Sequence, residues 1–504
     1  MSPYTFHEPL AASDPLLAAT AAFLRAQAPR AYLVGGWIRD RLLGLLCHDL
    51  DFAVDGDALS LARRLADELR GAYVVLDAER GAARVVVSCG GVQTLVDLTR
   101  LQGPDILADL AGRDFTVNAM AVEVGELDAP GATLMDPYGG LWDLEAGVLR
   151  MVSPTAFQDD PLRILRAVRL AGALGMTVEP GTEQAMATAA PLLTRPSGER
   201  VRDELAQILV LPNAGDRLRH LDKVGALTVV FPELEPLRGL AQPPPHYYDA
   251  LSHSLAAVDA LEAVLELHGT RHGVANGGLA GETLAPFLGR LRQHLEIPLV
   301  GGRPRMVLLK LAALLHDLGK PATVHTVEDG EAFAGHEALG AALAAGVLER
   351  LRFGVREIRL GHAIVTWHNR PSYYKRHPSD PRLDAYRFFR ETEEAGIDVL
   401  LLSLADHLAT RGPNLDREQW RWHLSVVGSL LRAYYEDYDR VVNPPALVDG
   451  HLLMSALQLS PGPEVGRLLE AIREAQVVGQ ITTPEEAVNL ARTMIQSREE
   501  ESHA

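Results

Sequence analysis

The sequence has very few cysteines, no long apolar run and a shortage of positive charge. Its 504 residues contain two cysteines, Cys47 and Cys89, which excludes a disulfide framework and fits a reducing cytoplasm. Every apolar stretch is interrupted by Arg, Asp, Glu or His within a few turns, so we expect no membrane-spanning segment. Residues 1–15 lack a basic start followed by an apolar run and predict no secretory signal.

The shortage of positive charge limits how much of the protein surface can bind nucleic acid. A formal net charge of −18 argues against a chain coated with RNA or DNA. Residues 163–223 differ from the rest, because they carry nine Arg or Lys and seven Asp or Glu, a net charge of +2. A local RNA-binding groove in this segment is therefore compatible with the negative net charge of the whole chain.

Hydrophobic periodicity divides the chain into two kinds of structure. From residue 31 to about 145, short β-like runs alternate with helical stretches, which predicts an α/β unit. From about residue 155 onward, apolar residues recur almost entirely at helical spacing. The expected strands are 31–36, 49–54, 73–77, 83–88 and 93–98, and an amphipathic helix is expected over 58–69.

Two glycines and two carboxylates form the first motif with chemical meaning. Gly35 and Gly36 follow a β-like run and open a helix, and such glycines let a backbone approach phosphates while Arg39 adds a cation. Asp49 and Asp51 occupy alternate positions of the next strand, so both carboxylates point to one face. Side-by-side carboxylates repel unless a cation such as Mg²⁺ lies between them.

This arrangement resembles a known enzyme superfamily. The run from Val34 to Val54, VGGWIRDRLLGLLCHDLDFAV, resembles the nucleotidyltransferase domain shared with DNA polymerase beta. More closely, it resembles class II CCA-adding enzymes and bacterial poly(A) polymerases. The resemblance implies that Asp49 and Asp51 bind two Mg²⁺ ions that activate the RNA 3′-hydroxyl and stabilise pyrophosphate. A third carboxylate is common in this superfamily, and Asp97 on the strand 93–98 is the candidate.

The same resemblance assigns residues to the incoming nucleotide. Residues 109–120, DLAGRDFTVNAM, resemble the family's R-R-D-F-T-I-N-A motif, with Arg113 as its second arginine and Gly112 in place of its first. Arg113 is therefore expected to contact the nucleotide, whereas Gly112 has no side chain to take the role of the first arginine. Asp114 is expected to hold Arg113 in place.

A third motif is expected to select the base. Asp160, Arg163, Arg166 and Arg169 recur at every third residue and form a stripe on a predicted helix, where three arginines favour a polyanionic ligand. The segment resembles the family's E-D-P-L-R-I-L-R-A-V-R motif. By resemblance, Asp160 accepts a hydrogen bond from the exocyclic amine of C or A, and Arg163 donates to the ring nitrogen. Arg166 and Arg169 then contact nucleotide or phosphates.

A separate group of histidines and aspartates resembles an HD domain, the metal-dependent phosphohydrolase fold. Histidine and aspartate together can hold one or two divalent transition metals that activate water against a phosphoester. A lone buried histidine is usually a satisfied core residue, but this order of six makes a metal site the better interpretation. The residues that match are His253, His316, Asp317, His336, His368 and Asp406.

The fold class predicted is an α/β, DNA polymerase beta-like head followed by all-α neck, HD and tail domains. The boundaries we expect are 1–150 for the nucleotidyltransferase head, 151–240 for the helical nucleotide- and RNA-binding neck, 241–412 for the HD domain with a Gly-rich insert at 268–304, and 413–504 for a C-terminal helical region with an acidic tail. The expected activity is template-independent addition of C, A or both from CTP and ATP to the 3′ end of tRNA.

Three alternatives stay open at this point. A poly(A) polymerase, or a partial enzyme that adds only CC or only A, would share every motif. An HD phosphohydrolase with an RNA-binding head would not need the Asp49/Asp51 pair. An alarmone synthetase–hydrolase also joins the two domain types, but with the HD domain first. The sequence leaves the oligomeric state undetermined.

Overall fold

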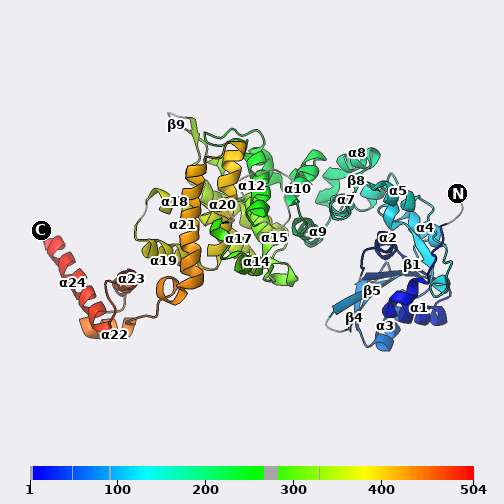
Figure 1. Cartoon of the computed structure of the whole chain (residues 1–504), viewed down its shortest axis with the longest axis horizontal. Helices are drawn as coiled ribbons and strands as arrows, with labels where there is room; N and C mark the ends of the chain where they lie inside the picture. Colours follow the sequence, from blue (N-terminus) through cyan, green and yellow to red (C-terminus); the bar gives the residue numbers. More distant parts are fainter. Residues whose placement is uncertain are drawn as a thin grey trace. The chain divides into compact units, whose positions relative to one another are not determined.

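The computed structural model describes residues 4–47, 49–89, 92–265, 282–327, 330–377 and 379–503. The chain divides into two compact units (Figure 1). The first, called the head unit below, comprises Met1–Pro196 and His220–Val229. The second, the helical unit, comprises Ser197–Arg219 and Val230–Ala504. Within the described residues, none of the helices combines the length and apolar character needed to cross a lipid bilayer.

A mixed sheet with strand order β3-β4-β5-β2-β1-β6 forms the centre of the head unit. Strand β2 pairs in parallel with β5 and antiparallel with β1, so it is interior to the sheet. All five strands predicted from the sequence are present. The bounds are β1 Ala31–Val34, β2 Asp49–Val54, β3 Ala72–Asp77, β4 Ala82–Cys89, β5 Val92–Arg100 and β6 Ala121–Glu123.

The two faces of this sheet have different coverings. One face buries the main apolar core under α1 (Pro15–Gln27) and α3 (Ala58–Leu69), and Leu50 and Phe52 of β2 belong to it. The other face carries a smaller cluster that includes Val34, Ala53 and Leu110 of α4 (Ile106–Ala111). Since side chains alternate along a strand, burying Leu50 and Phe52 turns Asp49 and Asp51 toward this second face.

A tight turn links the sheet to the helices that follow it in the head unit. The Asp136 carboxylate accepts hydrogen bonds from the backbone N–H of Gly140 and Leu141, which start α5 (Gly140–Ala146). A Cβ at Gly140 would lie 2.1 Å from the Thr116 carbonyl oxygen, so only glycine fits there. The remaining elements of this part are α2 Gly36–Leu42, β7 Val148–Leu149, α6 Ala156–Asp159, α7 Arg163–Leu174, β8 Thr177–Val178 and α8 Pro180–Ala189.

The rest of the chain is helical, as its periodicity predicts. Helix α12 packs against α15 and α20, and α16 packs against α17. The bounds are α9 Gly198–Val210, α10 Ala214–Lys223, α11 Leu227–Val230, α12 Ala250–Val264, α14 Leu288–Glu296, α15 Arg305–Leu315, α16 His336–Arg350, α17 Val355–Trp367, α18 Arg370–Arg376, α19 Pro381–Thr392, α20 Gly396–Arg411, α21 Arg417–Glu436, α22 Gly450–Leu457, α23 Pro463–Val477 and α24 Pro484–His503, with a short hairpin of β9 His325–Val327 and β10 Gly330–Ala332.

A buried ion pair joins several segments of the helical unit. The Lys310 Nζ lies 2.6 Å from a Glu262 carboxylate oxygen and 2.6 Å from the Leu209 carbonyl oxygen. The same Glu262 carboxylate accepts hydrogen bonds from the backbone N–H of Asn213 and Ala214. Because each buried charge is paired and hydrogen-bonded, removing either partner would leave the other as an unpaired buried charge and destabilise the fold.

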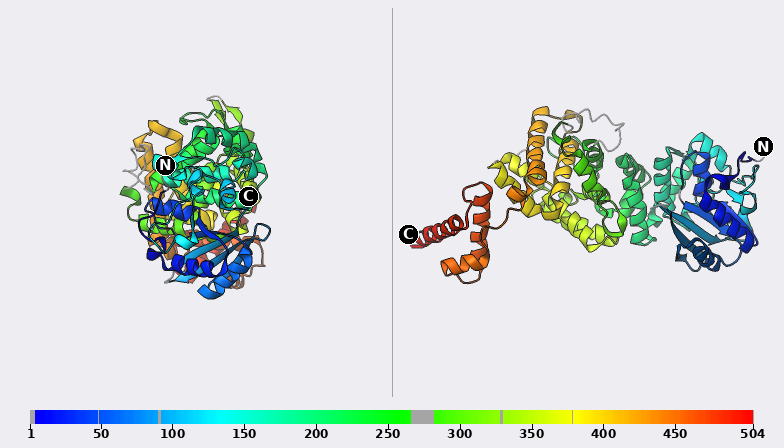
Figure 2. Two further views of the ribbon diagram at one scale, coloured as in Figure 1. Left: turned by 90° about the vertical axis from the view of Figure 1, so that its right-hand side faces the viewer. Right: turned by 60° about the horizontal axis from the view of Figure 1, so that its bottom comes forward.

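Two expectations about the later chain can be compared with the structure. The first part of the predicted insert, up to residue 281, lies outside the described residues, and its second part contains the helix α14. The C-terminal helices α22, α23 and α24 are drawn in orange to red in Figure 2. They pack around an apolar cluster of their own, which includes Leu453, Leu468 and Ile472. Helix α24 continues into the acidic tail as far as His503.

Candidate active site and metal centre

A glycine with unusual backbone geometry lies between strand β1 and helix α2. Gly35 has φ +75°, and a Cβ there would lie 3.0 Å from the Arg113 Nη1 atom and 3.4 Å from an Asp51 carboxylate oxygen. This conformation disfavours any residue with a side chain. Gly35 therefore allows the turn, the arginine and the carboxylate to lie against one another.

Three carboxylates lie on neighbouring strands beside this turn. Asp49 and Asp51 are on β2, and Asp97 of β5 is directly opposite Asp51 in the parallel ladder. Burial raises the pKa of Asp51 to about 6, and the negative charges of Asp97 and Asp49 add to this rise, while Arg113 opposes it. A cation bound here would relieve the repulsion, so the donor set suits a hard divalent ion such as Mg²⁺.

The raised pKa of Asp51 has a consequence for stability. Because its carboxyl binds a proton more tightly in the folded protein than in the unfolded chain, its contribution to stability is largest at acidic pH and is lost as the pH rises through about 6. Without divalent metal, we expect the free energy of unfolding of wild type to fall relative to Asp51→Asn by on the order of 2 kcal/mol between pH 4 and pH 7. Denaturant unfolding at several pH values measures this difference, and parallel curves for the two proteins would contradict it.

Two arginines near the carboxylates are held by specific partners. Arg113 donates from Nε and Nη2 to the Asp109 carboxylate, at 3.3 and 3.2 Å. Arg39 donates to Asp40 and, from Nη1, to the Asn118 side-chain oxygen at 2.7 Å. The expectation that Asp114 holds Arg113 was wrong, because Asp109, one helical turn earlier, holds it.

Asp114 instead connects the sheet to helix α7. Its buried carboxylate accepts hydrogen bonds from the Phe115 backbone N–H, the Asn118 side chain and Arg166. Burial by itself would raise the pKa of Asp114, but Arg166 and the two hydrogen bonds outweigh this and lower it. The ion pair between Asp114 and Arg166, which are 52 residues apart in sequence, therefore connects the 109–120 motif to the motif on α7.

The motif that the sequence predicts to select the base lies on α7 and on the turn before it. Asp160 ends α6, and its carboxylate accepts from the Leu162 backbone N–H just before α7 begins. Arg163 donates from Nη2 to the Gly112 carbonyl at 2.7 Å and from Nη1 toward the Arg113 carbonyl. Arg166 and Arg169 follow on the same helix. Thus the structure brings Arg163 and Arg166 to the segment 112–114, which contains Arg113, while Asp160 lies at the turn before α7.

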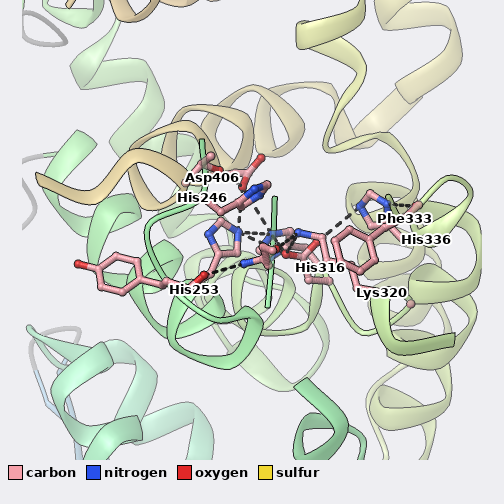
Figure 3. Close-up of polar contacts among 12 residues, drawn as sticks. His246, His253, His316, Lys320, Phe333, His336 and Asp406 are labelled. Atoms are coloured by element: carbon pink, nitrogen blue, oxygen red, sulfur yellow. Dashed lines mark hydrogen bonds and ion pairs between the residues drawn. The ribbon is translucent and has the colours of Figure 1, made fainter. Parts of the chain in front are cut away.

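In the helical unit, four histidines from separate parts of the chain lie together, His253, His316, His336 and His368. Figure 3 labels the first three of them. Their Nε2 atoms face the centre, and three of them fix the ring by an Nδ1 contact to the carbonyl three residues earlier. These contacts are His316 to Ala313 at 2.8 Å, His336 to Phe333 at 2.8 Å and His368 to Val365 at 2.7 Å. Histidines that bind a metal through Nε2 are typically oriented in this way.

Two aspartates complete this cluster. The His253 Nε2 atom lies 3.2 Å from the His316 Nε2 atom, 3.3 Å from Asp317 and 3.1 Å from Asp406. The Asp317 Oδ1 and His336 Nε2 atoms are buried without a hydrogen-bond partner. Within the described residues, the compact groups with metal-ligand geometry are His253, His316 and Asp406, and His316, Asp317 and His368. All six HD residues predicted from the sequence therefore converge, and the head carboxylates form a looser group.

The electrostatics of the histidine cluster indicate where a cation is favoured. Burial lowers the pKa of His316, but Asp317 and Asp406 outweigh it and raise this pKa to about 10. Burial, together with the positive His316, lowers the pKa of His368 to about 4. Adjacent imidazoles thus differ strongly in proton affinity, and a divalent cation in place of the proton would compensate both aspartates.

A cavity of about 1010 Å³ opens onto the cluster. His336, His368, Asp317 and Asp406 lie on its wall, together with Lys320, Arg376, Arg411 and Trp422. Lys320 donates to the second Asp317 oxygen, Oδ2, at 2.6 Å and to Gln242 at 2.6 Å. The sequence analysis missed Lys320, although it follows Asp317 by one helical turn and its charge next to a carboxylate was a visible signal.

Three segments of the chain match described protein families. Residues 31–150 match the poly A polymerase head domain, residues 175–237 match the probable RNA and SrmB-binding site of polymerase A, and residues 281–411 match the HD domain. The first two matches lie on the sheet and the helices after it. The third includes five of the six residues of the histidine–aspartate cluster.

Similar proteins cover nearly the whole chain. The A-adding tRNA nucleotidyltransferase of Deinococcus radiodurans is 36% identical over 91% of this chain and 94% of its own length. The CC-adding tRNA nucleotidyltransferase of Thermus thermophilus is 35% identical over 91% and 92%. A solved CCA-adding enzyme in complex with ATP has the same fold, with a TM-score of 0.63 and 21% identity, covering 98% of this chain and 100% of that one.

Proposed function

Because the chain belongs to the tRNA nucleotidyltransferase family and is an RNA nucleotidyltransferase, we propose that it adds C, A or both from CTP and ATP to the 3′ end of tRNA. The observation that carries this proposal is the position of Arg113 and Gly35 directly beside Asp51. A cationic group, an open backbone turn and paired carboxylates are the parts that phosphoryl transfer requires.

The head carboxylates and arginines would share the work of the transfer. The tRNA 3′-oxygen forms a bond to the α-phosphorus of the nucleotide, the α–β phosphoanhydride bond breaks, and pyrophosphate leaves while the hydroxyl proton passes to water. Asp49 and Asp51 would hold Mg²⁺, which supplies charge neutralisation and a lower pKa for the 3′-hydroxyl when bound. Arg113, oriented by Asp109, would bind the triphosphate, and the turn at Gly35 leaves room for it.

Selection of the base would depend on the turn before α7 and its first residue. The Asp160 carboxylate can accept from the exocyclic amine of C or A, and the Arg163 guanidinium can donate to the adjacent ring nitrogen. U and G present the reversed pattern of donors and acceptors. Arg163 lies against the backbone of Gly112 and Arg113, so the groups that bind the base and the triphosphate would be neighbours.

The nucleotides added can be read from a single assay. We expect incorporation of C, A or both when tRNA lacking CCA, tRNA ending in CC and complete tRNA are each incubated with one NTP at a time and the products sequenced. Incorporation of C alone, A alone or both in order distinguishes the CC-adding, A-adding and complete enzymes. Long A tails would identify a poly(A) polymerase instead, and no incorporation on any acceptor would overturn the proposal.

A second activity is supported by the histidine–aspartate cluster. Histidines oriented through their Nδ1 atoms, and a buried aspartate oxygen that accepts no hydrogen bond and lies 3.5 Å from the His336 Nε2 atom, are typical of a divalent transition-metal site. The residues that would hold the ion are His253, His316, Asp317, His336, His368 and Asp406. When bound, such an ion supplies a water nucleophile, so we infer hydrolysis of a phosphoester in the adjoining cavity.

A further inference from the structure

A row of charged side chains crosses the open face of the head sheet. Asp51 on β2 is opposite Asp97 on β5, and Asp97 is opposite Arg84 on β4. Residues opposite each other in a ladder point to the same face, so these three share the face that carries the active site. Arg84 donates from Nε and Nη2 to the two oxygens of Asp97, both at 2.8 Å.

The groups proposed to bind the nucleotide all lie at the Asp51 end of this row, next to β1. Gly35 follows β1, which pairs with the other edge of β2, and Arg113 lies beside Gly35. Arg163 contacts the Gly112 and Arg113 carbonyls, which places the base-selecting helix near the same segment. The triphosphate and the base are therefore expected on the β1 side of the carboxylates.

The other end of the row, over β5 and β4, is accessible to solvent and differs in chemistry. The Arg84 and Asp97 side chains are 35% and 19% exposed, and the fork that binds Asp97 leaves the Arg84 Nη1 atom for another ligand. Val86 and Leu95, which pair across β4 and β5, are half-buried, and Val74 of β3, opposite Arg84, is 44% exposed. A guanidinium beside a shallow apolar surface can bind a phosphodiester and the sugar or base attached to it.

The geometry of phosphoryl transfer decides what this surface would bind. The attacking oxygen and the leaving oxygen are roughly in line, so the acceptor hydroxyl must approach from the side away from the pyrophosphate. With the triphosphate on the β1 side of Asp49 and Asp51, the acceptor approaches over β5 and β4. We propose that the open face of β4 and β5 is the subsite for the RNA acceptor end, and that Arg84 binds a phosphodiester of its terminal nucleotides; this rests on the function proposed above.

Steady-state kinetics of Arg84→Ala test the subsite. We expect the KM for tRNA to rise about tenfold, because one charge-assisted hydrogen bond is lost. The KM for the nucleotide should stay unchanged within about twofold. The slope of log KM for tRNA against log salt should become shallower by about 0.7, the contribution of one phosphate contact on a single strand. Arg84→Lys keeps the charge and should recover most of the affinity for tRNA.

The matched control is Arg80→Ala, because Arg80 is an exposed arginine in the turn before β4 whose ion pair is with Asp77. It should leave both KM values unchanged. If Arg84 only orients Asp97, Arg84→Ala will lower kcat or alter the magnesium requirement without changing the KM or salt slope for tRNA, and the subsite is refuted. A wild-type protein that adds no nucleotide refutes the proposed function instead, and direct tRNA binding by wild type and Arg84→Ala, measured without NTP, separates the two failures.

Discussion

Asp51→Asn and Asp49→Ala are each expected to reduce nucleotide addition by about a thousandfold or more. Either change removes a carboxylate from the pair proposed to hold magnesium, and losing several kcal/mol of charge stabilisation costs tenfold in rate for every 1.36 kcal/mol. The measurement is incorporation of labelled CTP and ATP into tRNA at saturating substrate and magnesium. Full incorporation by either variant would rule out the metal assignment.

The folded state should survive these changes. Asp51 is destabilised by burial and by the neighbouring carboxylates, so Asp51→Asn should leave the thermal midpoint unchanged or raise it in metal-free buffer. The matched control is Asp55→Asn, just beyond the other end of β2, which removes only an exposed ion pair with Arg30. Such a pair contributes little stability, so the control should retain normal addition.

His316→Ala is expected to abolish metal binding by the helical unit. His316 belongs to both compact ligand groups. Changing a residue that only orients a ligand lowers metal affinity by up to about a hundredfold, so removing a proposed direct ligand should lower it by more than that. Elemental analysis of the purified full-length protein measures the metal content. Hydrolysis of bis(p-nitrophenyl) phosphate should be lost with the metal, while nucleotide addition should continue.

Two further variants guard against misfolding as the cause. Asp406→Asn changes a different ligand with little change in volume and should also lose metal. His362→Ala removes an exposed histidine from α17, whose C-terminal end carries the proposed ligand His368, and should keep wild-type metal content. Equal metal content in wild type, His316→Ala and Asp406→Asn would exclude the proposed centre.

Local patterns predicted the parts of the head that depend on neighbours in sequence. The strands of the sheet, the shared face of Asp49 and Asp51 and the turn at Gly35 follow from alternation and glycine content, and the structure contains them. The placement of Asp97 opposite Asp51 required the parallel pairing of β2 with β5, which strand patterns alone do not specify. The sequence could propose Asp97 only through resemblance.

The partners of individual arginine side chains were what sequence reasoning missed. Arg113 was assigned to Asp114, its neighbour, but adjacent residues in this turn point to different partners, and Asp109 holds Arg113 from the preceding helix. Arg84 could not be predicted as a functional residue, because a single arginine in an apolar strand forms no motif and no repeating pattern. By contrast, all six residues of the histidine–aspartate cluster were found, since their order along the chain is itself the signal.

The location of β2 inside the sheet also has a consequence for local motion. Strands at a sheet edge can fray by breaking one ladder, whereas β2 is bonded to β5 on one side and to β1 on the other. Opening this strand therefore requires two sets of backbone hydrogen bonds to break together, along with exposure of Leu50 and Phe52. We therefore expect β2, which carries Asp49 and Asp51, to open more rarely than the edge strands of the head sheet, so that the spacing of the two carboxylates stays constant.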